Sequence, residues 1–204
     1  MDITNYAKDY NSKLSAIENC INLLKPENID TLEHVTKVSK TGIGIANNYG
    51  LDKDKVETAC YLHDISALVP KDDYIEVCEN NGIEVLDCER KIPMLLHQKI
   101  SKLVAEKVFN IADSEILSSI ESHTTLRNEP CDVDMVVFIA DKLSWDQDGI
   151  PPFYECVSTA INESLGKACL EYINFCLDNN MILIPHPMLI EAKAYLEENI
   201  KGKK

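Results

Sequence analysis

Four histidines and two aspartates stand where a helical stripe of apolar residues would place them in a protein interior: His34, His63, Asp64, His97, His123 and Asp141. A single buried histidine is most simply explained as a hydrogen-bonded core residue. Asp141 is harder to explain in this way, because it directly follows the apolar run 135–140 and a buried carboxylate is costly unless it is paired or binds a metal. Imidazoles and carboxylates without buried bases to pair with form the ligand set of a mixed nitrogen and oxygen metal centre. The pattern therefore predicts a metal site.

Helices are expected to position these side chains, because apolar residues recur at helical spacing and only 7 Gly and 8 Pro interrupt the chain. The first helix is expected over about 6–24 and ends before Pro26. A capping box of Asp30 and Glu33 then starts a second helix, which stops at Gly50. Further helices are expected over 52–65, 71–80, 96–109, 114–123, 133–145, 153–163, 165–179 and 187–200, with an irregular segment from Gly82 to Pro93. The sequence thus predicts an all-α fold in which 133–145, the most apolar helix, is central.

The order of the polar residues, a His, then His-Asp, then two further His and an Asp, resembles the HD-domain phosphohydrolase superfamily. Within it the chain is most similar to the YqeK-type symmetrical bis(5′-nucleosyl)-tetraphosphatases, which split diadenosine tetraphosphate into two ADP. The matching segments are Glu33-His34, Leu62-His63-Asp64-Ile65, Leu95-Leu96-His97, His123-Thr124-Thr125-Leu126-Arg127 and Ile139-Ala140-Asp141-Lys142. The resemblance implies a single HD-domain helical bundle over 27–204, preceded by an N-terminal helical extension over 1–26.

The resemblance also implies two metal ions. The first would be held by His34, His63, Asp64 and Asp141, and the second by His97 and His123, with Asp64 bridging. His63 and Asp64 are the expected catalytic residues, and a metal-bound hydroxide would attack phosphorus in an in-line displacement. The cofactors would be two divalent or mixed-valence ions, iron before manganese or magnesium, since histidine ligands suit iron and manganese better than magnesium.

Three residues are the expected substrate contacts: Thr124, Arg127 and Lys142. The Arg127 guanidinium could bind a phosphate in bidentate fashion or lie on the surface. Lys142 could face substrate or solvent, and Thr124 could contact substrate or make hydrogen bonds within its loop. Trp145, the only Trp in the chain, could form a pocket wall on which a base stacks, or fill the core.

Several basic residues typical of the YqeK-type branch are missing here. None precedes the first histidine in Thr31-Leu32-Glu33-His34, none follows directly in His63-Asp64-Ile65-Ser66-Ala67, and Lys142-Leu143-Ser144-Trp145 replaces a Glu-Pro segment. Fewer basic side chains should weaken the binding of a four-phosphate chain. A different nucleotide or phosphate ester is therefore an alternative substrate, and a catalytically inactive ligand-sensing module is an alternative function.

The balance of charge favours a small anionic ligand over a nucleic acid. The 20 Lys and Arg face 34 Asp and Glu, for a net charge of -14, which repels phosphate backbones and anionic lipids. No export signal or membrane-spanning run is evident, so we expect a cytoplasmic protein with a small nucleotide substrate and no nucleic-acid or membrane partner. The N-terminal helix could pack on a partner or on a second copy in a homodimer.

Three further features have structural interpretations. The 8 Cys form no C-x-x-C pair and are expected to be reduced thiols. Gly42 and Gly44 indicate a close approach of helices rather than a dinucleotide loop, since no strand precedes them and the third Gly is missing. His186, between two prolines and outside the motif order, is expected to have a structural or surface role.

Overall fold

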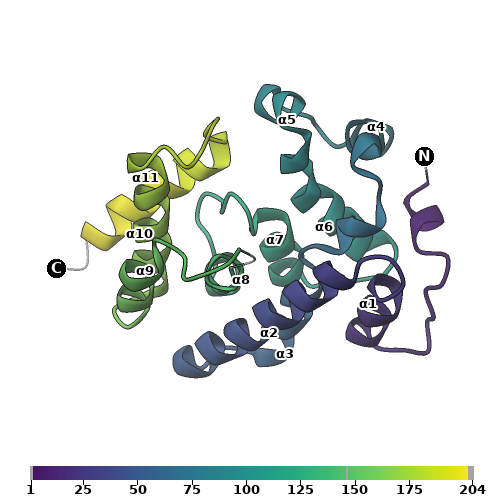
Figure 1. The fold of residues 1–204 in the computed structure, drawn as a ribbon, viewed down its shortest axis with the longest axis horizontal. Helices are drawn as coiled ribbons and strands as arrows, with labels where there is room; N and C mark the ends of the chain where they lie inside the picture. Colours follow the sequence, from purple (N-terminus) through teal and green to yellow (C-terminus); the bar gives the residue numbers. More distant parts are fainter. Residues whose placement is uncertain (1, 146, 202–204) are drawn as a thin grey trace.

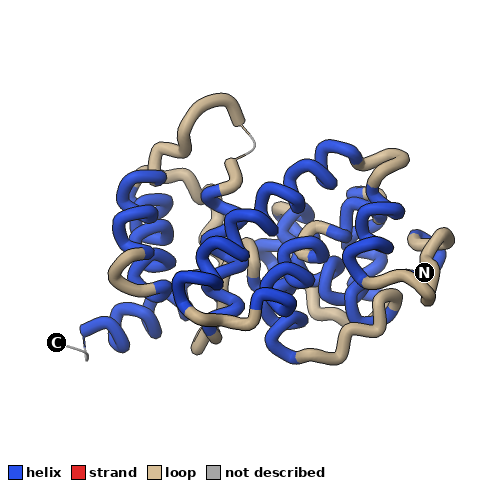
Figure 2. Tube along the Cα trace, turned by 90° about the horizontal axis from the view of Figure 1, so that it is seen from below, coloured by secondary structure: helices blue, strands red, loops and turns tan. Residues whose placement is uncertain are grey.

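A computed structural model describes residues 2–145 and 147–201, and every regular element within them is a helix (Figure 2). The α-helices are α1 (Ala16–Leu24), α2 (Ile29–Tyr49), α3 (Lys53–Leu62), α4 (Tyr74–Asn80), α5 (Asp87–Lys91), α6 (His97–Lys107), α7 (Ser114–Ser122), α8 (Asp132–Leu143), α9 (Tyr154–Ile161), α10 (Leu165–Asp178) and α11 (Pro187–Lys201). Four short 3-10 helices join them: η1 (Ile3–Tyr6), η2 (Ile65–Leu68), η3 (Lys71–Asp73) and η4 (Pro93–Leu96). The predicted all-α fold is confirmed.

Helix α8 lies at the centre of the molecule, as its apolar sequence predicts. Val136 to Ala140 are all fully buried, and α8 packs against α2, α3, α7 and α10. Figure 1 shows α8 between the group of α9, α10 and α11 on one side and α2, α3, α6 and α7 on the other. Because the middle of this helix is buried, a charged group beside it needs a partner of its own.

The N-terminal segment differs from the expected single helix over 6–24. It forms the short η1, then turns, and α1 begins only at Ala16. Ser15 and Glu18 make a capping box there, because the Ser15 Oγ accepts from the Glu18 N–H at 3.2 Å and the Glu18 carboxylate accepts from the Ser15 N–H at 2.8 Å. The Asn19 side chain accepts from the Asn11 N–H at 2.8 Å and holds the preceding turn against α1.

Two other local predictions were wrong. Helix α2 begins at Ile29, so Asp30 lies inside the first turn and makes no capping box with Glu33. The segment expected to be irregular contains α5, where the Glu89 carboxylate accepts from the Leu86 N–H at 2.7 Å and satisfies the helix start. The end of α2 is as predicted, because Gly50 adopts a left-handed conformation with φ of 65°.

The predicted close approach of helices occurs at Gly42. A Cβ atom there would lie 2.8 Å from the Cys60 Sγ and 3.1 Å from a Val56 methyl group, so α2 and α3 pack closely only because this position has no side chain. All eight cysteines are free thiols. No helix in the described ranges is long and apolar enough to cross a bilayer.

Candidate metal centre

The six predicted ligands come from five separate helical regions and meet at one place. The residues are His34 in α2, His63 and Asp64 at the end of α3, His97 at the start of α6, His123 at the end of α7, and Asp141 in α8. His63 and His123 are almost fully buried, and His34 is 9% exposed. The structure therefore brings together side chains that are more than one hundred positions apart in the sequence, such as His34 and Asp141.

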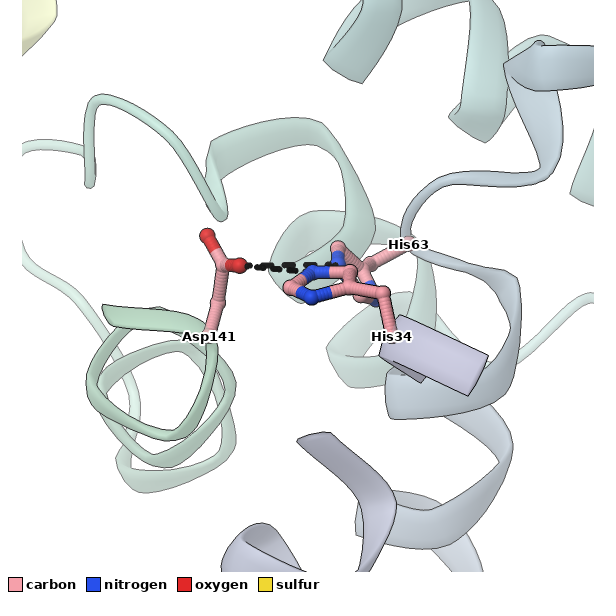
Figure 3. A group of neighbouring side chains, drawn as sticks. All are labelled: His34, His63 and Asp141. Carbon is pink, nitrogen blue, oxygen red and sulfur yellow. Dashed lines mark hydrogen bonds and ion pairs between the residues drawn. The ribbon is translucent and has the colours of Figure 1, made fainter. Parts of the chain in front are cut away.

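One half of the cluster is formed by His34, His63 and Asp141, which point toward one another in Figure 3. The His34 Nε2 lies 3.1 Å from the Asp141 Oδ1 and 3.3 Å from the His63 Nε2, and the His63 Nε2 lies 3.7 Å from the same Oδ1. Three donor atoms within 4.8 Å of one another can share a single cation.

Asp64 connects this half to the other two histidines by using a different oxygen for each side. Its Oδ2 lies 3.5 Å from the His63 Nε2 and 3.8 Å from the His34 Nε2. Its Oδ1 lies 3.6 Å from the His97 Nε2 and 3.5 Å from the His123 Nε2. This arrangement suits a carboxylate that bridges two cations.

Three of the histidines are oriented by the backbone. Each Nδ1 lies within hydrogen-bond distance of the carbonyl oxygen three residues earlier: 2.7 Å for His63, 2.6 Å for His97 and 2.8 Å for His123. A carbonyl can only accept, so Nδ1 carries a proton and Nε2 is the ring nitrogen that faces the cluster. The His97 and His123 Nε2 atoms are 2.8 Å apart, so two lone pairs face each other and require a proton or a cation between them. The donor set therefore fits a metal centre.

The electrostatics of the cluster are consistent with metal ligation. Burial lowers the pKa of His97 and, with help from neighbouring histidines, holds the pKa of His123 well below its usual range, so both are neutral. Burial also disfavours protonation of His63, but Asp64 and Asp141 outweigh it and raise the His63 pKa to about 9. Burial would raise the pKa of Asp64, but the surrounding histidines lower it to about 2. Both carboxylates are therefore ionised at neutral pH, since Lys142 and two histidines keep the pKa of Asp141 well below its usual range despite burial.

Two of the three expected substrate contacts lie at the cluster. The Thr124 Oγ1 lies 3.0 Å from the His97 Nε2, at the edge of the cluster. The Lys142 Nζ lies 2.6 Å from the Asp141 Oδ2, and its side chain is only 14% exposed, so it faces the site and not the solvent. Lys142 therefore leaves the other oxygen of Asp141, Oδ1, to the histidines.

Arg127, the third expected contact, is held elsewhere. Its Nε donates to the Asp134 Oδ2 at 2.8 Å, and Asp134 is fully buried in the first turn of α8. Asp134 also accepts from the Ser118 hydroxyl at 2.5 Å and from the Cys131 N–H at 2.9 Å. A buried carboxylate needs these partners, so the guanidinium compensates Asp134 and is not directed at the histidines. A role for Arg127 in phosphate binding stays a prediction.

Sequence reasoning missed Gln98, which supports the second half of the cluster. This buried side chain accepts from the Thr124 N–H at 3.2 Å and contacts the Thr125 Oγ1 at 3.2 Å. It thereby ties the start of α6, with His97, to the turn that follows His123. Its position next to His97, on the buried side of a helix, is the sequence feature from which this role could have been predicted.

Comparison with known proteins agrees with this geometry. The family model of the HD domain matches residues 31–146. An "Uncharacterized protein in pepC 5'region" of Lactococcus lactis subsp. cremoris is 41% identical over 153 residues, which cover 75% of this chain and 78% of that protein. The "Bis(5'-nucleosyl)-tetraphosphatase, symmetrical" of Bacillus subtilis is 24% identical, over 76% of this chain and 84% of that protein.

A solved structure shares the fold. It is the crystal structure of a "predicted HD superfamily hydrolase involved in NAD metabolism" from Clostridium acetobutylicum, with a TM-score of 0.76, 28% identity, and coverage of 90% of this chain and 96% of that chain. The resemblance expected from the order of histidines and aspartates is thus confirmed. The chain belongs to the HD domain family and is an HD-domain phosphohydrolase distantly related to the symmetrical bis(5′-nucleosyl)-tetraphosphatases.

Proposed function

We propose that this chain is a metal-dependent hydrolase of nucleotides, with symmetrical cleavage of diadenosine tetraphosphate into two ADP as the leading reaction. One observation carries the proposal: the Nε2 lone pairs of His97 and His123 face each other at 2.8 Å while Asp64 divides its oxygens between two histidine pairs. The names of the distant relatives from Bacillus subtilis and Staphylococcus aureus support the substrate.

Each half of the cluster would hold one cation. His34, His63, Asp64 and Asp141 supply the first set of ligands, and His97, His123 and the second oxygen of Asp64 supply the other set. The chemistry that two cations supply at such a site is Lewis-acid stabilisation of a phosphoryl group and a lowered pKa for an attacking water. Nitrogen-rich ligands favour iron or manganese, with magnesium as the weaker candidate.

Residues around the cations would orient the ligands and the substrate. Lys142 holds one oxygen of Asp141 and thereby fixes how that carboxylate faces the histidines. The Thr124 hydroxyl, 3.0 Å from the His97 Nε2, can donate a hydrogen bond to a phosphate oxygen instead. Two cations beside two carboxylates make the centre locally positive, which allows a small phosphate ester to bind inside a molecule of net charge -14.

The test combines metal analysis with product analysis. Protein as purified should contain close to two equivalents of metal and should release ADP from diadenosine tetraphosphate. Asp64→Asn should lose metal and lower kcat/KM by more than about 100-fold, because both ligand sets share this carboxylate. Asp30→Asn is the matched control, since Asp30 is an exposed residue of α2 beside the cluster and should retain activity. Metal-loaded protein that hydrolyses no phosphate ester would refute the proposal.

A second candidate substrate is a nucleotide with fewer phosphates. Its specific support is Arg127, whose Nε is engaged by buried Asp134 and so contributes little charge at the cluster. Product analysis over a panel of mononucleotides, dinucleotides and cyclic nucleotides separates the two candidates. A kcat/KM at least tenfold higher for a shorter nucleotide than for diadenosine tetraphosphate would establish the second.

A further inference from the structure

A small aromatic pocket opens directly from the metal centre. It has a volume of about 230 Å³, and two of the proposed ligands, His34 and Asp141, form part of its wall. Three aromatic residues, Trp145, Phe153 and Tyr172, also line it. A molecule whose phosphate lies at the cluster would therefore extend its remaining part into this pocket.

The aromatic wall is held in place by edge-to-face packing. Phe153 is 1% exposed, and its ring lies 4.9 Å from that of Tyr172 and 5.6 Å from that of Trp145, at interplanar angles of 90° and 80°. Such contacts orient rings without filling the space beside them. Trp145 remains partly exposed, so it both packs on the core and lines the pocket.

Most of the polar side chains that line the pocket are already engaged by other residues. The Ser144 hydroxyl donates to the Thr41 Oγ1 at 3.1 Å, and the charge of Lys142 is balanced by Asp141. At the rim, the exposed Gln147 amide has no hydrogen-bond partner among the described residues. The pocket thus offers a flat apolar surface and an amide without a partner among the described residues, which suits an uncharged planar group better than a further phosphate.

The two other cavities at the cluster have a different chemistry. One, of about 400 Å³, is lined by Asp30, Glu33 and Lys37 and contains no aromatic residue. The other, of about 270 Å³, has Tyr74 as its one aromatic residue, beside Lys71 and Met94. Of these three cavities, all lined by described residues, the one at Trp145 combines Trp145, Phe153 and Tyr172 with two proposed metal ligands.

We propose that the Trp145 pocket binds the nucleobase of a nucleotide substrate, with the base packed on the indole ring and its polar edge toward Gln147. This assignment rests on the proposed function. It makes Trp145 a substrate-binding residue that favours nucleotides over phosphate esters without a base, because stacking on an aromatic side chain contributes substantially to binding and depends little on which base is bound. The pocket adjoins Asp141 and Lys142, so the base would lie on the Asp141 side of the metal centre.

The single Trp makes a direct test feasible, since all indole emission comes from this pocket. Full-length protein with its copurified metal is titrated with ADP and, separately, with inorganic pyrophosphate. ADP should change the emission in a saturable way. Pyrophosphate should compete with ADP but leave the emission unchanged, because it has no base. An equal change with both ligands, or no change with ADP, would overturn the assignment.

Kinetics of variants test the same point without fluorescence. Trp145→Ala should raise KM for the nucleotide roughly tenfold and change kcat by less than about twofold, and Trp145→Phe should restore most of the affinity. Tyr154→Ala is the control, because Tyr154 is 43% exposed and does not line the pocket. An unchanged KM in Trp145→Ala, with nucleotide hydrolysis intact, refutes the pocket assignment alone, whereas absence of hydrolysis on any nucleotide removes the proposed function and the assignment together.

Discussion

The histidines at the centre are prepared for metal binding by their local backbone. His63 and His123 each follow the last residue of a helix, and the carbonyl three positions earlier lies 2.7 Å and 2.8 Å from their Nδ1 atoms. His97 has the same relation to the end of η4. The ends of α3 and α7 leave the carbonyls that face His63 and His123 without an intrahelical partner, so position along the helix sets both the orientation of these rings and the site of the Nδ1 proton.

Metal affinity should depend on pH through His63. In the metal-free protein the two nearby carboxylates raise its pKa to about 9, against the effect of burial, so it is protonated at pH 7 and must release a proton to bind a metal. The apparent affinity for manganese should therefore rise by roughly tenfold per pH unit from pH 7 and level off near pH 9.

Titration calorimetry in buffers of different ionisation enthalpy measures this proton release directly. About one proton should be released at pH 7 when an ion binds to the set that contains His63. Asp30→Asn, which leaves all proposed ligands in place, should show the same dependence. An affinity that is flat between pH 7 and pH 9 would contradict the expected state of His63.

At the scale of elements, the crossing of α2 and α3 sets the distance between His34 and His63. Gly42 lies eight residues after His34 in α2, and Cys60 lies three residues before His63. The two helices approach so closely at this pair that a Cβ atom on Gly42 would lie 2.8 Å from the Cys60 Sγ. A larger side chain would separate the helices that carry these ligands.

Two alanine substitutions in the same helix should have opposite effects on stability. Gly42→Ala should lower the free energy of unfolding by about 1 kcal/mol, because overpacking against Cys60 outweighs the better helix propensity of alanine. Gly44→Ala, at an exposed position with no atom within 4 Å of the added Cβ, should raise it by up to about 1 kcal/mol. Urea unfolding of both variants measures the difference, and two changes of the same sign would contradict the close crossing.

At the scale of the whole molecule, the C-terminal helices contact the rest of the chain at several places, among them a hydrogen bond from the Tyr49 hydroxyl of α2 to the Ile161 carbonyl of α9. Helix α10 packs on α8. The segment before α11 extends toward α5 at the top of Figure 1. There the His186 Nε2 lies 3.4 Å from the carboxylate of Glu89, which also pairs with the Lys99 Nζ at 2.8 Å. Glu89 is fully buried and His186 is 2% exposed, so the structural alternative expected for His186 is the correct one.

Replacing Glu89 should lower the free energy of unfolding far more than replacing a nearby surface glutamate. Glu89→Ala leaves Lys99 without its buried partner and should lower the free energy of unfolding by about 3–5 kcal/mol. Glu79→Ala removes only an ion pair with Arg90, in which both side chains are about half exposed, and should cost less than about 1 kcal/mol. Equal unfolding midpoints in urea for the two variants would show that the buried cluster does not hold the C-terminal helices.

The residues of the cluster, the all-α fold and the central place of α8 were predictable from sequence, because each depends on properties carried along the chain. Helical spacing of apolar residues marks the buried face. A carboxylate next to an apolar run, such as Asp141, is then recognisable as a functional candidate, because burying it costs free energy unless it is paired or binds a metal. The left-handed Gly50 that ends α2 is similarly a local property.

The contacts of Lys142 and Arg127 were decided only by the tertiary structure. Both are basic residues near a predicted ligand in sequence, yet Lys142 binds Asp141 at the cluster whereas Arg127 binds the buried Asp134. The division of the Asp64 oxygens between two histidine pairs also arises only where five helical regions meet. The ion-pair partner of a long basic side chain depends on which carboxylate lies within a few ångströms of it in the folded protein. Distant helices bring these groups together, so the spacing of residues along the sequence does not determine the partner.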